Sequence, residues 1–530
     1  MTQQNSSRHA NANLFQLFAN RFPHDLSQPA LETHEGLHYS WHDLLAASAR
    51  IAHLLTSLKL PAGSRVAVQV EKSPEALMLY LATLRAGLVY LPLNPAYQKA
   101  EMAYFIANAE PAVVVCSPNH FGWVSRLAFK TGTAHVFTLG EDRTGTLLER
   151  AVRFADEFVT VISQPDDLAA ILYTSGTTGR SKGAMLTHGN LAASAKVLND
   201  YWAWRNGQTA QHEGERDVLL HALPLFHIHG LFVACHGALL SGSKMIFLPK
   251  LDVSAILHHL PRCTMLMGVP TYYTRLLADA RFTRELCANI RLFVSGSAPL
   301  LLDTFKQFQV RTGHTILERY GMSETGMLTS NPYDSAEGPR VGGTVGKALP
   351  GVNLRVVNDQ GQPCAVDEIG HVQVKGANVF VGYWQMPEKT REEFTDDGYF
   401  KTGDVGKLDA QAYLSIVGRS KDLIITGGYN VYPKEIESYI DDMPGVLESA
   451  VIGIPHPDFG EAVTAVVVPK PDGQVDESVI IAQLKQLIAN YKVPKQVIVV
   501  DELPRNAMGK IQKNVLRQMY SPTTTGLQTA

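Results

Sequence analysis

The sequence is poor in cysteine, in long apolar runs and in net charge. Five cysteines are scattered through 530 residues and none forms a C-x-x-C pair, which argues against a disulfide framework and against a zinc site. This usage fits a reducing, cytosolic compartment best. No apolar run approaches the ~18–20 residues that span a bilayer. A net charge of −3 gives no clustered basic face for nucleic acid.

The remaining composition is that of an ordinary globular protein, with 45% hydrophobic and 18% charged residues. The length predicts two or three domains, because single cores stop growing near ~250–300 residues. The first residues, MTQQNSSRHANANLFQLFANRFPHD, have no acid before Asp25 and faintly resemble a transit peptide. Against an organellar address, Leu14, Leu17 and Phe18 already indicate an opening helix, and no cleavage signal follows.

The order of apolar segments predicts an α/β fold. From about residue 60 to 350, short β-rich runs alternate with helical patterns, which is typical of mainly parallel sheets covered by helices. Residues 340–415 have the short strands and tight turns of a small β subdomain. We expect an N-terminal domain over residues 1–418 and a small mobile α+β domain over residues 419–530, with a helix beginning at Pro433. Ligands are expected at the strand carboxyl ends.

The stretch ILYTSGTTGRSKG, residues 171–183, concentrates hydrogen-bond donors behind an apolar run. Leu168–Tyr173 suits a buried strand, and helical spacing follows His188, so we expect a strand, a glycine loop and a helix around an anion. It is not a Walker A loop, because only Thr177 and Thr178 separate Gly176 from Gly179. Polyphosphate binding is favoured over a solvated linker. The candidate ligands are Thr174, Ser175, Gly176, Thr177, Thr178, Gly179 and Lys182.

This stretch resembles the signature of the adenylate-forming superfamily, which includes acyl-CoA synthetases, luciferases and peptide-synthetase adenylation domains. Further motifs extend the resemblance over nearly the whole chain: PLFHIHG, SGSAPL, ERYGMSET, YFKTGD, GRSKDLIITGGYNVYPKEIE and PRNAMGK. The resemblance implies that a carboxylate attacks the α-phosphate of ATP, and that the thiol of coenzyme A then displaces AMP. Such charge accumulation requires cations and a metal.

The resemblance also implies roles for individual residues. Glu324 corresponds to the Mg²⁺ ligand, with Thr177 as a second contact, and Asp404 to the ribose ligand. Lys510 would reach the α-phosphate and the attacking carboxylate, assisted by Lys182. Arg419 would contact ribose or phosphate, and Lys421 would be the hinge. The expected nucleotide lining is Ser297, Ala298, Pro299, Glu318, Arg319, Tyr320, Gly321, Met322 and Ser323, and the expected border of the CoA tunnel is Gly427, Gly428 and Tyr429.

The segments PLFHIHGLF, MLMGVPTYYTRLL and RLFVSGSAPL are similar to malonyl-CoA synthetases. A dicarboxylate keeps one ionised group that would be costly to bury unpaired, so the acyl pocket needs a cation. Arg291 is the candidate, with Thr271, Ser295 and His227 as further hydrogen-bonding groups. His227 has the rival role of a gate between thiol tunnel and acyl pocket.

The sequence therefore predicts an ATP-dependent carboxylate–CoA ligase, with malonate or methylmalonate as the acid and a place in fatty acid metabolism. It would act as a monomer or homodimer without nucleic acid. The alternatives are a broader short- or medium-chain acyl-CoA synthetase and a domain that loads a carrier protein, for which the expected Asp near GVPTYY is not seen. A nucleotide sensor without catalysis is disfavoured, because Glu324 and Lys510 are both present.

Overall fold

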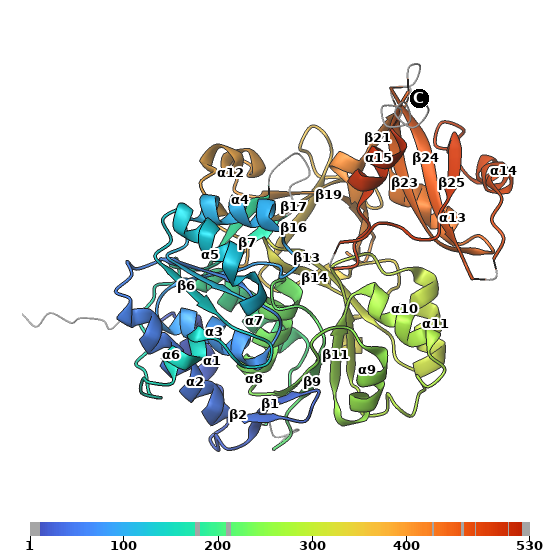
Figure 1. Cartoon of the computed structure of the whole chain (residues 1–530). Coiled ribbons are helices and arrows are strands. Elements are labelled where there is room, and N and C mark those ends of the chain that lie inside the picture. Colours follow the sequence, from blue (N-terminus) through green and yellow to red (C-terminus); the bar gives the residue numbers. More distant parts are fainter. Residues whose placement is uncertain are drawn as a thin grey trace, which may run out of the picture.

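Four β-sheets organise the described part of the chain (Figure 1). The computed structural model describes residues 11–174, 181–207, 214–426, 429–456, 460–471, 473–506 and 508–521. Three of these sheets form a large N-terminal region, and the fourth belongs to a small domain near the C-terminus. The predicted α/β fold class is confirmed.

The first sheet contains strands in the order β18-β8-β7-β4-β3-β5-β6, and β7, β4, β3, β5 and β6 run parallel. Its strands are apolar because helices bury both faces; α3 has every residue buried. The strands are β3 (Arg65–Gln69), β4 (Val89–Pro92), β5 (Val113–Cys116), β6 (His135–Thr138), β7 (Leu168–Thr174), β8 (Lys182–Thr187) and β18 (Gly382–Tyr383). The helices of this part are α1 (Leu14–Ala19), α2 (Trp41–Ser57), α3 (Pro74–Arg85), α4 (Lys99–Ala109), α5 (Phe121–Lys130) and α6 (Thr146–Ala151).

The second sheet has the order β15-β14-β13-β12-β11-β9-β10-β1-β2 and is parallel from β1 to β13. The strands are β1 (Pro29–Thr33), β2 (His38–Ser40), β9 (Val218–His221), β10 (Lys244–Phe247), β11 (Met265–Gly268), β12 (Leu292–Ser295), β13 (Leu317–Met322), β14 (Gly326–Ser330) and β15 (Lys347–Ala348). The helices are α7 (His188–Tyr201), the π-helix η3 (His229–Cys235), α8 (His236–Ser241), α9 (Val253–His259), α10 (Pro270–Ala278) and α11 (Leu302–Thr312).

The predicted small β subdomain is an antiparallel sheet of β16 (Asn353–Val357), β17 (Gly370–Lys375), β19 (Phe400–Leu408) and β20 (Leu414–Arg419), accompanied by α12 (Pro387–Glu393). In its register Asp404 lies opposite Arg419. After β20 the chain passes through a short turn, η6 (Ser420–Asp422), into the fourth sheet. The other short 3-10 turns are η1 (Pro118–His120), η4 (Leu260–Arg262) and η5 (Ser335–Glu337).

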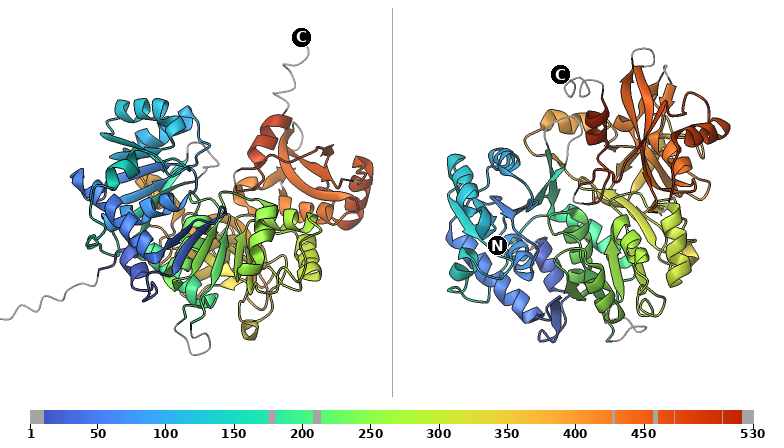
Figure 2. Two further views of the ribbon diagram at one scale, coloured as in Figure 1. Left: turned by 60° about the horizontal axis from the view of Figure 1, so that its bottom comes forward. Right: turned by 45° about the vertical axis from the view of Figure 1, so that its right-hand side comes forward.

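The C-terminal domain is a mixed sheet with helices and rests against one side of the large region (Figure 2). Its strands are β21 (Ile424–Thr426), β22 (Tyr429–Val431), β23 (Val446–His456), β24 (Gly460–Pro469) and β25 (Gln496–Val499). Its helices are α13 (Pro433–Asp441), α14 (Glu477–Leu487) and α15 (Lys513–Tyr520), so Pro433 begins a helix as predicted. Apolar residues from both faces of the sheet form two clusters of their own.

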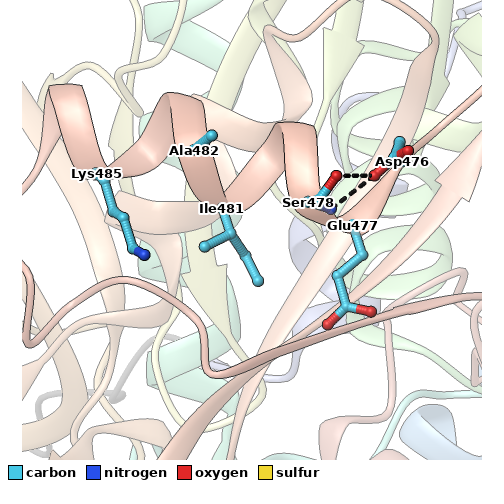
Figure 3. A pocket seen from close by; sticks show the side chains of 6 residues that line it. All are labelled: Asp476, Glu477, Ser478, Ile481, Ala482 and Lys485. Atoms are coloured by element: carbon cyan, nitrogen blue, oxygen red, sulfur yellow. Dashed lines mark hydrogen bonds between the residues drawn. The ribbon is translucent and has the colours of Figure 1, made fainter.

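A shallow hollow lies on α14 (Figure 3), lined by Asp476, Glu477, Ser478, Ile481, Ala482 and Lys485. Asp476 caps the helix by accepting bonds from the backbone and hydroxyl of Ser478. None of the predicted site residues lines it, so it has no part in the site below. Among the described helices, none has the length and apolarity needed to cross a membrane.

Candidate active site

The carboxyl ends of β9, β11, β12 and β13 meet at one edge of the second sheet and hold most of the predicted site. The loop after β12 carries Ser297, whose φ of +71° is a strained conformation for a residue with a side chain. Ala298 and Pro299 follow in the same loop. Such strain at a strand end is common at ligand sites, which agrees with the predicted lining of the nucleotide.

The donor-rich loop lies between two antiparallel strands, because Thr174 at the end of β7 pairs with Lys182 at the start of β8. The expected strand–loop–helix arrangement is therefore wrong. Residues 182–187 form β8, and α7 begins only at His188, capped by Thr187. The predicted ligands Ser175, Gly176, Thr177, Thr178 and Gly179 lie outside the described residues.

Lys182 nevertheless points into the site. Its ammonium lies 3.5 Å from Glu393 Oε1 and 4.3 Å from the centroid of the Tyr383 ring. Tyr383 donates in turn to Glu324 Oε1, at 3.1 Å. Lys182 and Glu324 are thus joined through one tyrosine, although they are far apart in sequence.

Glu324 is 5% exposed, and burial raises the pKa of its carboxyl above the usual range. Lys182 and Arg419 oppose this rise. No cluster of three or more His, Cys, Asp or Glu side chains suited to a metal occurs in the described residues. A single carboxylate is enough for a Mg²⁺ ion that is bound mainly by substrate phosphates, as Mg²⁺ often is.

Asp404 is the junction between β13, β19 and β20. Its carboxylate accepts a 2.5 Å bond from the Tyr320 hydroxyl and pairs with Arg419 Nε at 2.8 Å. Burial, followed by the Asp404 charge, raises the pKa of Tyr320 well above its ordinary value. Each carboxylate oxygen retains lone pairs, so the predicted ribose contact is compatible with these bonds. Gly321 and Ser323 continue from Tyr320 into the turn before β14.

Cations gather on the other side of Asp404. Enclosure by protein and repulsion by Arg419 lower the pKa of Lys510 to about 8. The same two causes lower the pKa of Lys421 to about 8. Lys510 is nevertheless exposed to solvent, so it is not part of a closed core. This concentration of positive charge is suited to a polyanion.

His227 lies just before η3, and His229 is the first residue of η3; the charge of Lys510 acts on His227. Burial lowers the pKa of His227 to about 4, helped by the charges of Arg319 and Lys510. Burial also holds the pKa of His229 well below its ordinary value. His229 Nδ1 lies 3.3 Å from Ser297 Oγ, while its Nε2 is buried without a partner in the described part of the chain. Both imidazoles are therefore neutral near pH 7.

Arg319, which was expected to line the nucleotide, lies within β13 as a buried side chain. The side chain is 3% exposed, and its Nε and Nη2 have no partner among the described residues. Its guanidinium packs on Gly296, where an added Cβ would stand 2.4 Å from Cζ. Neighbouring strand residues face opposite sides, so Arg319 points away from the side of Glu318 and Tyr320. The alternation of side chains along a strand was the sequence feature from which this orientation of Arg319 could have been predicted.

Two further buried polar groups lie on the face of the sheet opposite Arg319, where Ser295 pairs with Glu318 in the strand register. Ser295 Oγ has no partner within the described residues, and neither has Glu318 Oε2. Glu318 Oε1 accepts a bond from the Leu300 backbone, and burial raises the pKa of Glu318 to about 8. The side chains around the β12 and β13 ends thus present unused donors and acceptors to one another or to a ligand.

Arg291 has a different role from the predicted one. It precedes β12 at the end opposite Ser295, and it donates to both carboxylate oxygens of Asp217, at 2.8 and 2.6 Å. Its Nη1 donates to the Trp202 carbonyl and to the Tyr333 hydroxyl. The prediction that Arg291 binds the acid is therefore corrected, because its guanidinium is already paired inside the protein.

Of the remaining predicted residues, Thr271 contacts the other domain, while Tyr429 packs within its own domain. Thr271, in the first turn of α10, faces Gly509 of the C-terminal domain, where a Cβ would stand 2.7 Å from Thr271 Oγ1. Tyr429 is 58% exposed and stacks on Tyr491 with centroids 4.6 Å apart. Met322 is half-buried beside the β13–β14 turn. Gly427 and Gly428 lie outside the described residues.

Comparison with known proteins agrees with this arrangement. The AMP-binding enzyme model matches residues 15–384, and the AMP-binding enzyme C-terminal domain model matches residues 435–510. A malonate–CoA ligase of Arabidopsis thaliana is 33% identical, over 91% of this chain and 85% of its own. The mitochondrial malonate–CoA ligase ACSF3 of Homo sapiens is 35% identical, over 83% of this chain and 80% of its own.

Among solved structures, ATP-bound MatB from Rhodopseudomonas palustris is 54% identical, with 97% of this chain and 100% of its own covered and a TM-score of 0.92. The family models together cover the N-terminal region that holds the strand-end site and the domain that carries Lys510. The chain belongs to the AMP-binding enzyme family.

Proposed function

We propose that the protein is an AMP-forming acid–thiol ligase that converts malonate, ATP and coenzyme A into malonyl-CoA, AMP and diphosphate. Methylmalonate is the proposed second substrate. Family membership and relatives that are named malonate–CoA ligases support the reaction class. The observation that carries the choice of acid is the buried guanidinium of Arg319, which has no partner in the described chain.

In the first step, one malonate carboxylate attacks the α-phosphate, and the bond to diphosphate breaks. Lys510 and Lys182 stabilise the charge that accumulates on the phosphate oxygens. Glu324 would hold a Mg²⁺ ion, which supplies further positive charge to the phosphates. In the second step, the CoA sulfur attacks the acyl carbon, the bond to AMP breaks, and the thiol proton leaves. The neutral imidazole of His227 borders the path of the thiol.

The second carboxylate of malonate would supply the partner that Arg319 lacks in the described chain. A buried guanidinium without a partner destabilises the free protein. A bound carboxylate would form two parallel hydrogen bonds with it, the strongest geometry for this pair. Burial lowers the pKa of Arg319 to about 9, so it stays charged at pH 7. The charge of Arg319 acts on His229, whose Nε2 is unpaired among the described residues and would provide a further bond.

A substrate panel tests the proposal directly. The purified protein is given ATP, Mg²⁺ and CoA with malonate, methylmalonate, acetate, octanoate or 3-methylbutanoate, and thioester is measured by mass spectrometry. The last acid has the branched shape of malonate without its second charge, so we expect malonate to be used at least 100-fold better, by about 3 kcal/mol. Equal or better use of a monocarboxylate would falsify the malonate proposal. Pyrophosphate exchange without any thioester would favour loading of a carrier protein instead.

The same proposal includes features that family membership leaves open. We place the domain boundary after residue 418, with Lys421 as the hinge, because η6 is the only described link between the third and fourth sheets. The proposed compartment is the cytosol, and the proposed assembly a monomer or homodimer. Mg²⁺ dependence is tested by chelation with EDTA, which should abolish adenylate formation and be reversed by added Mg²⁺.

A further inference from the structure

Hydrogen bonds connect the described residues of the loop that carries Lys510. Asn506 Oδ1 accepts bonds from the backbone of Met508 and of Lys510, both at 3.0 Å. The Asn506 backbone donates to the Lys510 carbonyl at 2.9 Å, and Arg505 Nη1 donates to the Gly509 carbonyl at 2.6 Å. Arg505 also pairs with Glu448 of β23. These bonds connect the described residues of the loop to one another and to β23, and we refer to residues 505–506 and 508–510 as the projection.

Met508 lies at the tip of this projection. Its side chain is 6% exposed and belongs to the large apolar cluster of the N-terminal region. The other clustered core residues after Arg419, in the described chain, belong to the two clusters of the C-terminal domain. Met508 is thus an apolar side chain of one domain that is buried in the core of the other.

Gly509 completes the contact. Its φ is +71°, and an added Cβ would stand 2.7 Å from Thr271 Oγ1 on α10. The projection therefore lies directly on the N-terminal turn of α10, with backbone where a side chain would not fit. Lys510 follows immediately, and its ammonium interacts electrostatically with Arg419, Asp404 and Asp422.

We propose that Met508 is a positioning residue for the adenylation step: its burial in the N-terminal region holds the projection so that Lys510 reaches the nucleotide site. Met508 has no group that could bind phosphate or accept a proton, so it acts only through Lys510. An unbranched thioether side chain fills an irregular gap well, which suits a contact between separately folded domains. The inference rests on the proposed function, because it assigns Met508 to one of its two steps.

The test separates the two steps in Met508→Ser. ATP-dependent release of pyrophosphate with malonate reports adenylation, and thioester formation from synthetic malonyl-adenylate and CoA reports the second step. Losing the burial of one large apolar side chain should slow adenylation about 10- to 100-fold and leave the second step within about 2-fold. Met508→Leu, which keeps volume and apolarity, should restore adenylation. Met519→Ser is the matched control, because Met519 on α15 is 54% exposed.

A measurement independent of catalysis accompanies these rates. A docked loop is a poor protease substrate, so trypsin should cut after Lys510 faster in Met508→Ser than in the parent or in Met519→Ser. Equal slowing of both steps, unchanged adenylation, or unchanged cleavage would each overturn the inference. Failure of the parent protein to form malonyl-adenylate would refute the proposed function instead, so the two failures are distinguishable.

Discussion

Two buried arginines are expected to respond in opposite ways when their charge is removed. Arg291→Met leaves Asp217, whose side chain is 0% exposed, without its bidentate partner. Removing one member of a buried ion pair costs about 3–5 kcal/mol. Two other bonds to Asp217, from Thr264 Oγ1 and the Arg205 backbone, place the expected loss of unfolding free energy near ~3 kcal/mol. Arg319→Met removes a charge that has no partner in the described chain, so stability without substrate should be unchanged or higher.

Substrate preference should show the reverse pattern. Truncating one partner of a desolvated charge pair costs about 2–5 kcal/mol of binding, so Arg319→Met should reduce the preference for malonate over 3-methylbutanoate by about 30-fold or more. Arg291→Met should keep the preference of the parent. Urea unfolding is followed by tryptophan fluorescence. Trp202 is a suitable reporter, because it is buried and its carbonyl accepts a bond from Arg291. A stable Arg291→Met with a selective defect for malonate, or an Arg319→Met with intact preference, would refute the assignment.

Three further predictions follow from the same geometry. Gly296→Ala should lower kcat/KM for malonate more than for 3-methylbutanoate, because the new Cβ would stand 2.4 Å from Arg319 Cζ; equal kcat/KM losses would contradict this. For the free enzyme, kcat/KM for ATP should fall as pH rises through about 8, where Lys510 loses its proton and with it the charge that stabilises phosphate; Lys421→Ala controls for the second lysine of similar pKa. In the folded protein Glu318 keeps its proton up to about pH 8, because burial raises its pKa from the ordinary value of 4.5. In the unfolded chain its pKa returns to that ordinary value. Stability should therefore fall as pH rises between these values, and Glu318→Gln should flatten that fall in urea titrations.

Most of the architecture was predictable because it depends on periodicity and on turn residues. The buried runs that became β3, β10, β11 and β12 are short and strongly apolar, and Pro433 marks a helix start whatever its surroundings. The segment 182–187 was the exception. Whether KGAMLT extends a loop or forms β8 depends on pairing with β7, which lies across the glycine loop. Pairing of that kind is decided by tertiary contacts that local propensity does not contain.

The sequence motifs predicted which residues form the site, but they did not predict which way each side chain points. Asp404 and Arg419 come from different motifs, and the sheet register brings them together. For the acyl pocket, the requirement for a cation followed from the charge of a dicarboxylate, but we named Arg291 as that cation and expected Arg319 only to line the nucleotide. Arg291 precedes its strand and Arg319 lies within one. Only the position of Asp217, 74 residues before Arg291, reveals which of them is already neutralised.

Unpaired buried polar atoms distinguish these two arginines better than motif position does. Twelve buried side-chain nitrogen and oxygen atoms lack a partner among the described residues, and five of them belong to Arg319, Glu318, His229 and Ser295. Each such atom destabilises the free protein, so the nitrogens of Arg319 that are unpaired in the described chain are unfavourable unless a ligand pairs them. Arg291, by contrast, donates to four protein groups, Asp217, the Trp202 carbonyl, Tyr333 and Met265 Sδ, and is already paired. We therefore propose a stabilising role for Arg291, which is already paired inside the protein, and the role of binding the second carboxylate for Arg319, whose Nε and Nη2 are unpaired within the described residues.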